Sequence, residues 1–152
     1  MEKARTFPVG VEHAYDVVLA APLPAIFSRR YGAIPPIKEV VGQEGAWGAA
    51  VGQTRTIRLS DGGTMQETLT AIDRPHRFGY TIGAVTGMMK PLVTAVEGVW
   101  AFEPAGTGTR ITWTWQVTPT PRLGRLAMPA FARLWSGYAR QAMDEIEQIL
   151  LR

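Results

Sequence analysis

Residues 110–118, Arg-Ile-Thr-Trp-Thr-Trp-Gln-Val-Thr, alternate large apolar side chains with polar ones. Successive side chains of a β-strand point to opposite faces, so this stretch is predicted to be a half-buried strand. Its apolar face carries Ile111, Trp113, Trp115 and Val117. Thr118-Pro-Thr-Pro121 ends the alternation, and a different period follows.

From Arg122 to Leu151 the apolar residues recur at steps of three and four, which predicts one long amphipathic helix. The stripe consists of Leu123, Leu126, Ala130, Leu134, Tyr138, Ala142, Ile146 and Ile149. Pro129 is expected to kink this helix or to separate its first turns, because proline lacks a backbone N–H.

Upstream of residue 110, short alternating segments are separated by proline and glycine. Strands are predicted at residues 11–20, 37–44, 53–59, 64–72, 77–85 and 93–102. The first would place His13, Tyr15, Val17 and Leu19 on one inward face. Ser60-Asp-Gly-Gly63 is a strong hairpin signal, and Pro22 opens a short helix that ends near Gly32.

These elements predict a single α+β domain over residues 1–152. We expect a curved antiparallel sheet of about seven strands wrapped around one long C-terminal helix, with two short helices after the first strand.

The composition excludes several classes of function. Cysteine and asparagine are absent and only two histidines occur, so disulfides, thiolate chemistry and the usual metal-ligand spacings are not expected. We predict neither a metal site nor a cofactor. The net charge is +3, but the sixteen basic residues are spread along the chain, which argues against nucleic-acid binding.

The N-terminus has no apolar stretch of the signal-peptide kind. No apolar run reaches the roughly 18 residues that an integral membrane segment needs. A cytoplasmic protein is therefore expected. The sequence leaves the oligomeric state open, with a homodimer as one alternative.

Three stretches carry a resemblance to a known family. They are Val17–Phe27, Gly52–Gly62 with Glu67–Asp73 and Phe78–Ile82, and Gly98–Trp113 with the long final helix. Over nearly the whole chain the order of elements resembles the START-like superfamily, also called SRPBCC or helix-grip, and most closely its polyketide cyclase/dehydrase-like branch. The resemblance implies an apolar cavity between sheet and helix that holds lipids, polyketides or other hydrophobic molecules. Some members of the family are cyclases or dehydratases.

Glu67 is the candidate catalytic residue, with Arg55 as its tentative partner. Glu67 shares a strand face with Met65 and Leu69, and the hairpin at residues 60–63 brings Arg55 close to it. A carboxylate that faces a dry cavity has a raised pKa and can exchange protons. Two alternatives stay open, namely a solvent-facing glutamate and a purely structural salt bridge.

Aromatic and methionine side chains are the candidate ligand contacts, because small-molecule cavities are lined mainly by apolar groups. An ordinary hydrophobic core would explain them as well. The residues are Tyr15, Tyr80, Met88, Met89, Trp113, Trp115, Phe131, Trp135 and Tyr138. Met88 and Met89, followed by Lys90, are expected at the entrance.

The sequence favours a binding module for a hydrophobic or amphipathic small molecule, because no nucleophile or histidine pair is present. The first alternative is a cofactor-independent cyclase, aromatase or dehydratase that uses Glu67, Arg55 and cavity tyrosines. The second is a module that binds a protein partner, which would require an exposed apolar patch of several hundred Å².

Overall fold

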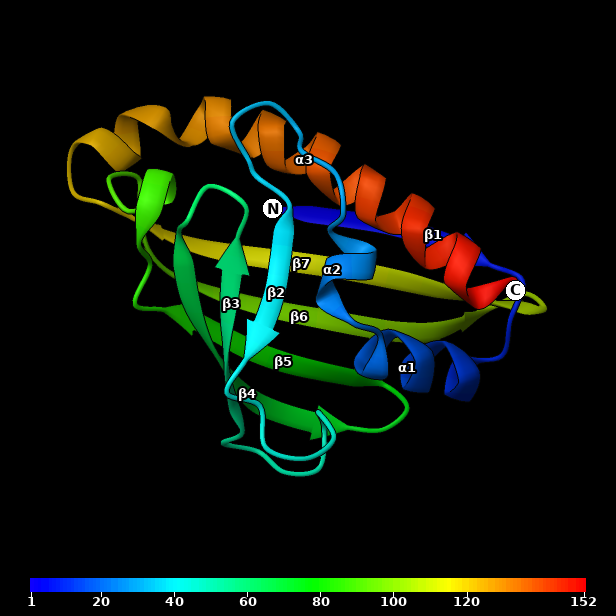
Figure 1. Ribbon diagram of the computed structural model, residues 1–152. Helices are drawn as coiled ribbons and strands as arrows, with labels where there is room; N and C mark the ends of the chain where they lie inside the picture. The colour runs from blue at the N-terminus through cyan, green and yellow to red at the C-terminus, as the bar shows by residue number, and fades with distance from the viewer.

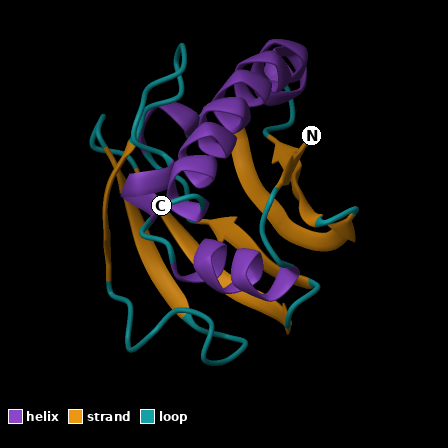
Figure 2. Cartoon of the chain, turned by 90° about the vertical axis from the view of Figure 1, so that its right-hand side faces the viewer, coloured by secondary structure: helices purple, strands orange, loops and turns teal.

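The computed structural model describes residues 1–152 as a seven-stranded, fully antiparallel sheet covered on one face by helices. The strand order is β1-β7-β6-β5-β4-β3-β2. Figure 1 shows the sheet curved beneath the long helix α3, and Figure 2 shows the helices on its concave side. The strands are β1 (Glu2–Phe7), β2 (Ile37–Val41), β3 (Thr54–Leu59), β4 (Thr64–Asp73), β5 (Arg77–Gly83), β6 (Val93–Ala105) and β7 (Gly108–Pro119). The helices are α1 (Val11–Ala20), α2 (Leu23–Ile26), the short 3-10 helix η1 (Gly87–Met89) and α3 (Leu123–Leu150).

The predicted fold class is confirmed, but the first strand was assigned to the wrong segment. Residues 11–20 form α1, and β1 lies earlier, at Glu2–Phe7. Ala14, Tyr15 and Val18 are the buried positions of α1, at the three- and four-residue spacing of a helix. His13, expected on an inward strand face, is exposed on α1.

The expected strands from residue 37 onward are present, with ends that differ by a few residues. Ile111, Trp113 and Trp115 of β7 are buried on the concave face, as their alternation predicts. β7 pairs with β1 on one side and with β6 on the other.

α3 runs unbroken through Pro129, so its first turns do not form a separate helix. Its predicted apolar stripe is correct from Tyr138 onward and wrong at the start, where Leu123 and Leu126 are 53% and 81% exposed. The buried face near the start is instead formed by Phe131 and Trp135.

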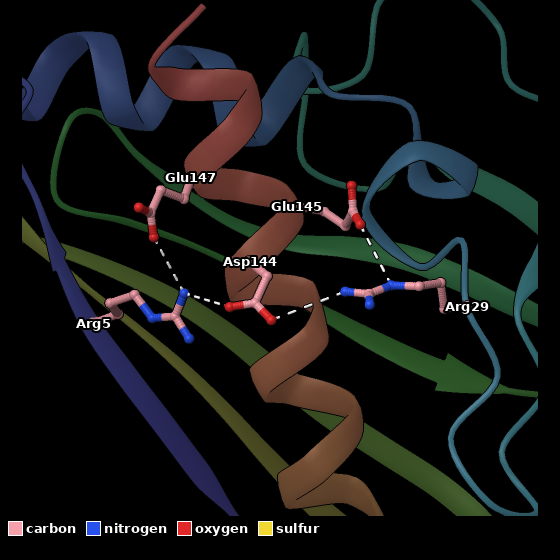
Figure 3. A network of polar contacts seen from close by, with 5 residues as sticks. All are labelled: Arg5, Arg29, Asp144, Glu145 and Glu147. Carbon is pink, nitrogen blue, oxygen red and sulfur yellow. Dashed lines mark hydrogen bonds and ion pairs between the residues drawn. The ribbon is translucent and has the colours of Figure 1, made fainter.

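The C-terminal half of α3 is held by a cluster of ion pairs (Figure 3). Arg5 of β1 contacts Asp144 at 2.8 Å and Glu147 at 3.4 Å, and Arg29 contacts Asp144 at 3.9 Å and Glu145 at 3.4 Å. Acidic residues near a helix C-terminus oppose the helix dipole, and these arginines compensate their charge. Each pair is solvated and contributes little alone.

No helix in the structure combines the length and the hydropathy required to cross a membrane.

Candidate functional site

An internal cavity lies on the concave side of the sheet, beneath α2 and the chain that follows it. Eighteen of its 21 lining residues are hydrophobic, and the other three are Pro35, Arg55 and Glu67. Strands β2 to β7 form the floor, whereas α2 and the segment of residues 31–36, which contributes Ile34 and Pro35, form much of the roof. α3 contributes only Tyr138. The expected position between sheet and C-terminal helix is therefore refined, because the short helix and its connection provide most of the cover.

Arg55 and Glu67 form a buried ion pair in the cavity wall. They are directly opposite each other on β3 and β4. Nε of Arg55 donates to Oε1 of Glu67 at 2.6 Å, and the two residues are 7% and 4% exposed. The salt bridge that the hairpin predicted is thus present on the inner face. The solvent-facing alternative for Glu67 is wrong.

Residues from the connection between β2 and β3 cover the outer side of Arg55. The guanidinium carbon lies 3.9 Å from the centroid of the buried Trp47 ring, which is cation–π geometry. Nη1 also donates to Oε1 of Gln43 at 3.4 Å. The side-chain amide of Gln53 bonds the backbone of this connection at four points, so the cover over Arg55 has a defined conformation.

Burial raises the pKa of the Glu67 carboxyl above its usual range, and the nearby Arg55 charge offsets part of this effect. No side chain or backbone N–H of the protein bonds its second oxygen, Oε2. Glu67 therefore combines a free oxygen with a pKa moved toward neutrality, which suits proton exchange with a molecule in the cavity.

A second polar cluster is centred on Tyr80 of β5. The Nε1 groups of Trp113 and Trp115 both donate to the Tyr80 hydroxyl, each at 2.8 Å. Tyr80 pairs with Gly98 of β6, and Gly98 pairs in turn with Trp115 of β7. A Cβ at residue 98 would lie 2.1 Å from the Tyr80 ring, so the ring can cross β6 only because residue 98 is glycine.

Tyr138 and the segment of residues 31–36 close the cavity on the side of α3. The Tyr138 hydroxyl donates to the carbonyl of Pro35 at 3.3 Å, and burial raises its pKa. The Tyr31 ring lies against Gly137 of α3, where a Cβ would come within 2.0 Å of it. This glycine lets the segment approach α3 closely.

The structure gathers some of the predicted site residues around the cavity and leaves others elsewhere. The lining includes Arg55, Glu67, Tyr80, Met89, Trp113, Trp115 and Tyr138. Tyr15, Phe131 and Trp135 are buried but lie outside the lining. Met88, next to the lining residue Met89 in the sequence, is outside the lining as well and is 58% exposed. Tyr15 packs against Phe78 and Phe102 from α1, with ring centroids 5.7 and 5.3 Å away.

Sequence reasoning missed the contribution of the first half of the chain. The lining residues that were not predicted as site residues are Val18, Leu19, Leu23, Ile26, Phe27, Ile34, Pro35, Ile37, Ile57, Leu59 and Met65, together with Phe78, Ile82 and Trp100. Ile82 and Tyr80 share a strand face at a spacing of two, which is a signal that could have placed Ile82 in the wall. No group of three or more histidine, aspartate or glutamate side chains is arranged to hold a metal ion.

The cavity volume is about 60 Å³, which is room for a few water molecules. Pockets that hold drug-sized ligands measure roughly 300–1,000 Å³. A ligand of lipid or polyketide size would therefore have to displace part of the wall.

Comparison with protein families gives one match, to the family of "Polyketide cyclase / dehydrase and lipid transport", over residues 1–150. The chain belongs to this family. The polyketide cyclase/dehydrase and lipid transport family is part of the helix-grip superfamily that the sequence resembles. A comparison with curated proteins finds no match.

Solved structures share the fold of this family member at low sequence identity. Ginseng major latex-like protein 151 from Panax ginseng has a TM-score of 0.70 and 15% identity, with 100% of this chain and 97% of that chain covered. XoxI from Bacillus cereus has a TM-score of 0.68 and 16% identity, with coverage of 99% and 94%. DynU16 from the dynemicin biosynthetic locus has a TM-score of 0.62 and 11% identity, with 99% of this chain and 46% of that chain covered. At these identities the likeness concerns the fold alone.

Proposed function

We propose that this protein binds a hydrophobic or amphipathic small molecule in the cavity under α2. The observation that carries the proposal is the lining, in which eighteen hydrophobic residues surround a few confined polar groups. Ligand sites in proteins have this composition, because apolar walls provide affinity and a few polar groups fix orientation. The family's description, which includes lipid transport, supports the same class of ligand.

Binding requires the cavity to widen, and the roof is the part that can yield. The floor strands are joined by long ladders of backbone hydrogen bonds. The roof is a helix of four residues followed by a segment that a few isolated bonds hold, such as Ile37 N to Phe27 O. Local opening occurs where hydrogen bonds and packing are sparse. We therefore expect α2 and residues 31–36 to move outward around a ligand.

Native mass spectrometry of freshly purified protein, with organic extraction of the same sample, tests this proposal. We expect added mass that disappears on denaturation and is recovered in the extract. Ile57→Trp would place an indole in the cavity and should abolish the added mass. Thr54→Trp, on the same strand but exposed, is the matched control and should retain it. Equal occupancy of both variants, or bare protein after incubation with a lipid extract, would contradict the proposal.

Cofactor-independent catalysis is a second candidate, favoured by the Arg55–Glu67 pair in the wall. Glu67 would take a proton from a carbon between two carbonyls of a polyketide-like chain. The resulting carbanion would attack another carbonyl carbon of the same chain, closing a ring. The alkoxide would regain the proton, and loss of water from this alcohol would complete a dehydration.

A synthetic 3,5,7-trioxo thioester, in which C2 can attack the C7 carbonyl and close a six-membered ring, tests this second candidate, with liquid chromatography and mass spectrometry of the products. Wild type should form the cyclised or dehydrated product, and the double variant Arg55→Met/Glu67→Leu should bind the thioester without converting it. Absence of turnover by wild type that binds the thioester would reject catalysis on this substrate class and leave the binding function standing.

A further inference from the structure

The hydroxyl of Tyr80 accepts two hydrogen bonds, but its own proton is not donated to any acceptor. A phenolic oxygen accepts through its lone pairs and donates its single proton. The indole N–H groups of Trp113 and Trp115 occupy the acceptor side at 2.8 Å each. The proton must therefore point away from both indoles.

No atom of the protein accepts that proton. The only hydrogen bonds that involve the Tyr80 hydroxyl are the two it receives from the indoles. Glu67 is on the same face of the sheet, opposite Ile82 and thus one diagonal step from Tyr80, but no hydrogen bond joins them. The other hydroxyl in the lining, that of Tyr138, already donates to Pro35. The Tyr80 proton is the one unused hydroxyl proton in the cavity wall.

The donor is also fixed in place and stays protonated. The Tyr80 ring lies across Gly98, and the two indoles hold its oxygen from β7. Burial raises the pKa of Tyr80 and the Glu67 charge raises it further, so the group is a neutral phenol at physiological pH. A buried donor without a partner is costly, and Tyr80 is a residue of the cavity lining, so a ligand in the cavity is the candidate partner.

We propose that Tyr80 donates a hydrogen bond to a carbonyl oxygen of the ligand, so that the cavity selects hydrophobic carbonyl compounds. The inference rests on the proposed binding function and names the ligand class for that site. A carbonyl oxygen only accepts, so it can take the Tyr80 proton without bringing a donor of its own. An alcohol would bring a further proton, which would have to reach the free Oε2 of Glu67 on the neighbouring strand. An apolar hydrocarbon would leave the Tyr80 proton unpaired.

Two small probes of the same shape test the inference, namely acetophenone and α-methylstyrene, in which a C=CH2 group replaces the carbonyl. Affinities measured by calorimetry give the preference for the ketone as a ratio. Tyr80→Phe removes the donor and should lower that ratio by about 3- to 10-fold, the net value of one hydrogen bond. Tyr138→Phe is the matched control, because its hydroxyl proton is already used, and should leave the ratio unchanged.

The infrared carbonyl band of bound acetophenone gives a readout that does not depend on a variant. Tyr80→Phe leaves two buried indole N–H groups without an acceptor, so we expect this variant to lose stability, whereas the band can be measured in wild type alone. A hydrogen bond weakens the C=O bond, and the band should lie below its position in a hydrocarbon solvent. A band at the hydrocarbon position would overturn the inference.

The failures of the two proposals are distinguishable. If neither probe binds, the cavity does not take hydrophobic molecules and both proposals fall. If both probes bind, but with the same ratio in wild type and in Tyr80→Phe, the binding function stands and the role of Tyr80 is rejected.

Discussion

The two ends of the concave face are covered in different ways. At the packed end, α1 lies against β6, and the buried Tyr15 places its ring 5.3 Å from Phe102, beside the fully buried Ile111 on β7. At the cavity end, α2 and residues 31–36 cover the side of the sheet that carries Ile57 and Glu67, and space remains. Both ends share one continuous sheet. The length and anchoring of the covering element therefore decide whether the concave face is filled or can accept a ligand.

The largest expected effect is the loss of stability when the buried Arg55–Glu67 ion pair is broken, compared with the loss when an exposed ion pair is broken. Arg55→Met should lower the free energy of unfolding by about 3–5 kcal/mol, because it leaves the Glu67 carboxyl buried without its counterion. The double variant Arg55→Met/Glu67→Leu should recover most of this loss. Urea unfolding followed by circular dichroism measures all three proteins.

The exposed pair of Asp16 and Arg74 is the matched control for that experiment. Its side chains are 52% and 51% exposed and joined at 2.8 Å, so Arg74→Met should change stability little. Equal losses from Arg55→Met and Arg74→Met would mean that the Arg55–Glu67 pair is solvated in solution.

Matched truncations of isoleucine compare the two ends directly. Ile111→Ala, at the packed end and fully buried, should cost near the top of the range of about 2–5 kcal/mol for such changes. Ile57→Ala, in the cavity wall, should lower the free energy of unfolding by an amount near the bottom of that range, about 2 kcal/mol, because fewer neighbouring atoms lose contact.

Thermal and urea unfolding of the two isoleucine variants check this order. Ile57→Ala should also bind acetophenone more tightly than wild type does, since it enlarges the cavity. A larger stability loss from Ile57→Ala than from Ile111→Ala would contradict the difference in packing between the two ends.

Gly137→Ala tests how the roof is anchored. Alanine normally stabilises a helix relative to glycine by about 1 kcal/mol. Here the added Cβ would meet the Tyr31 ring, so we expect a net loss of about 1–2 kcal/mol and faster amide hydrogen exchange in residues 31–36. Ser136→Ala, at the neighbouring position of α3, should leave exchange in that segment unchanged. Unaltered exchange in Gly137→Ala would show that the Tyr31 contact does not hold the roof.

The pH dependence of stability provides the smallest expected effect. The folded-state pKa of Glu67 is raised, so the folded protein binds a proton more readily than the unfolded chain. Wild type should therefore gain stability relative to Arg55→Met/Glu67→Leu as the pH falls from neutral toward the ordinary glutamate range. Asp16 behaves in the opposite way, because its bond to Arg74 lowers its pKa, and its contribution is lost as the pH falls below its unfolded value. Urea titrations at several pH values distinguish the two, and a wild type that loses stability relative to the double variant on acidification would reverse the sign assigned to Glu67.

The hairpins and the position of the Arg55–Glu67 pair on the inner face could be predicted from the sequence, because turn residues and strand alternation determine both locally. Ser60-Asp-Gly-Gly63 sets the register that places Arg55 opposite Glu67. The segment 11–20 was predicted wrongly because its valines favour a strand and its apolar residues fit both periods. β1 was missed because it is an edge strand that carries Glu2, Lys3 and Arg5, and its pairing with β7 decides its structure.

The cavity itself could not be predicted, because it depends on contacts between distant elements. The bonds from Trp113 and Trp115 to Tyr80 require the ring to lie across Gly98 on an intervening strand. The roof depends on the approach of Tyr31 to Gly137, more than a hundred residues away. Neither the hydrophobic periodicity nor the composition of the sequence predicts these long-range contacts.

An NMR titration of labelled protein with acetophenone tests the central claim most directly, because it locates binding at one end of the molecule. We expect shifts of the indole N–H signals of Trp113 and Trp115 and of amides in residues 31–36, with little change around Phe102 and Ile111. Shifts centred on the packed end, or on the exposed Leu123 and Leu126, would contradict it.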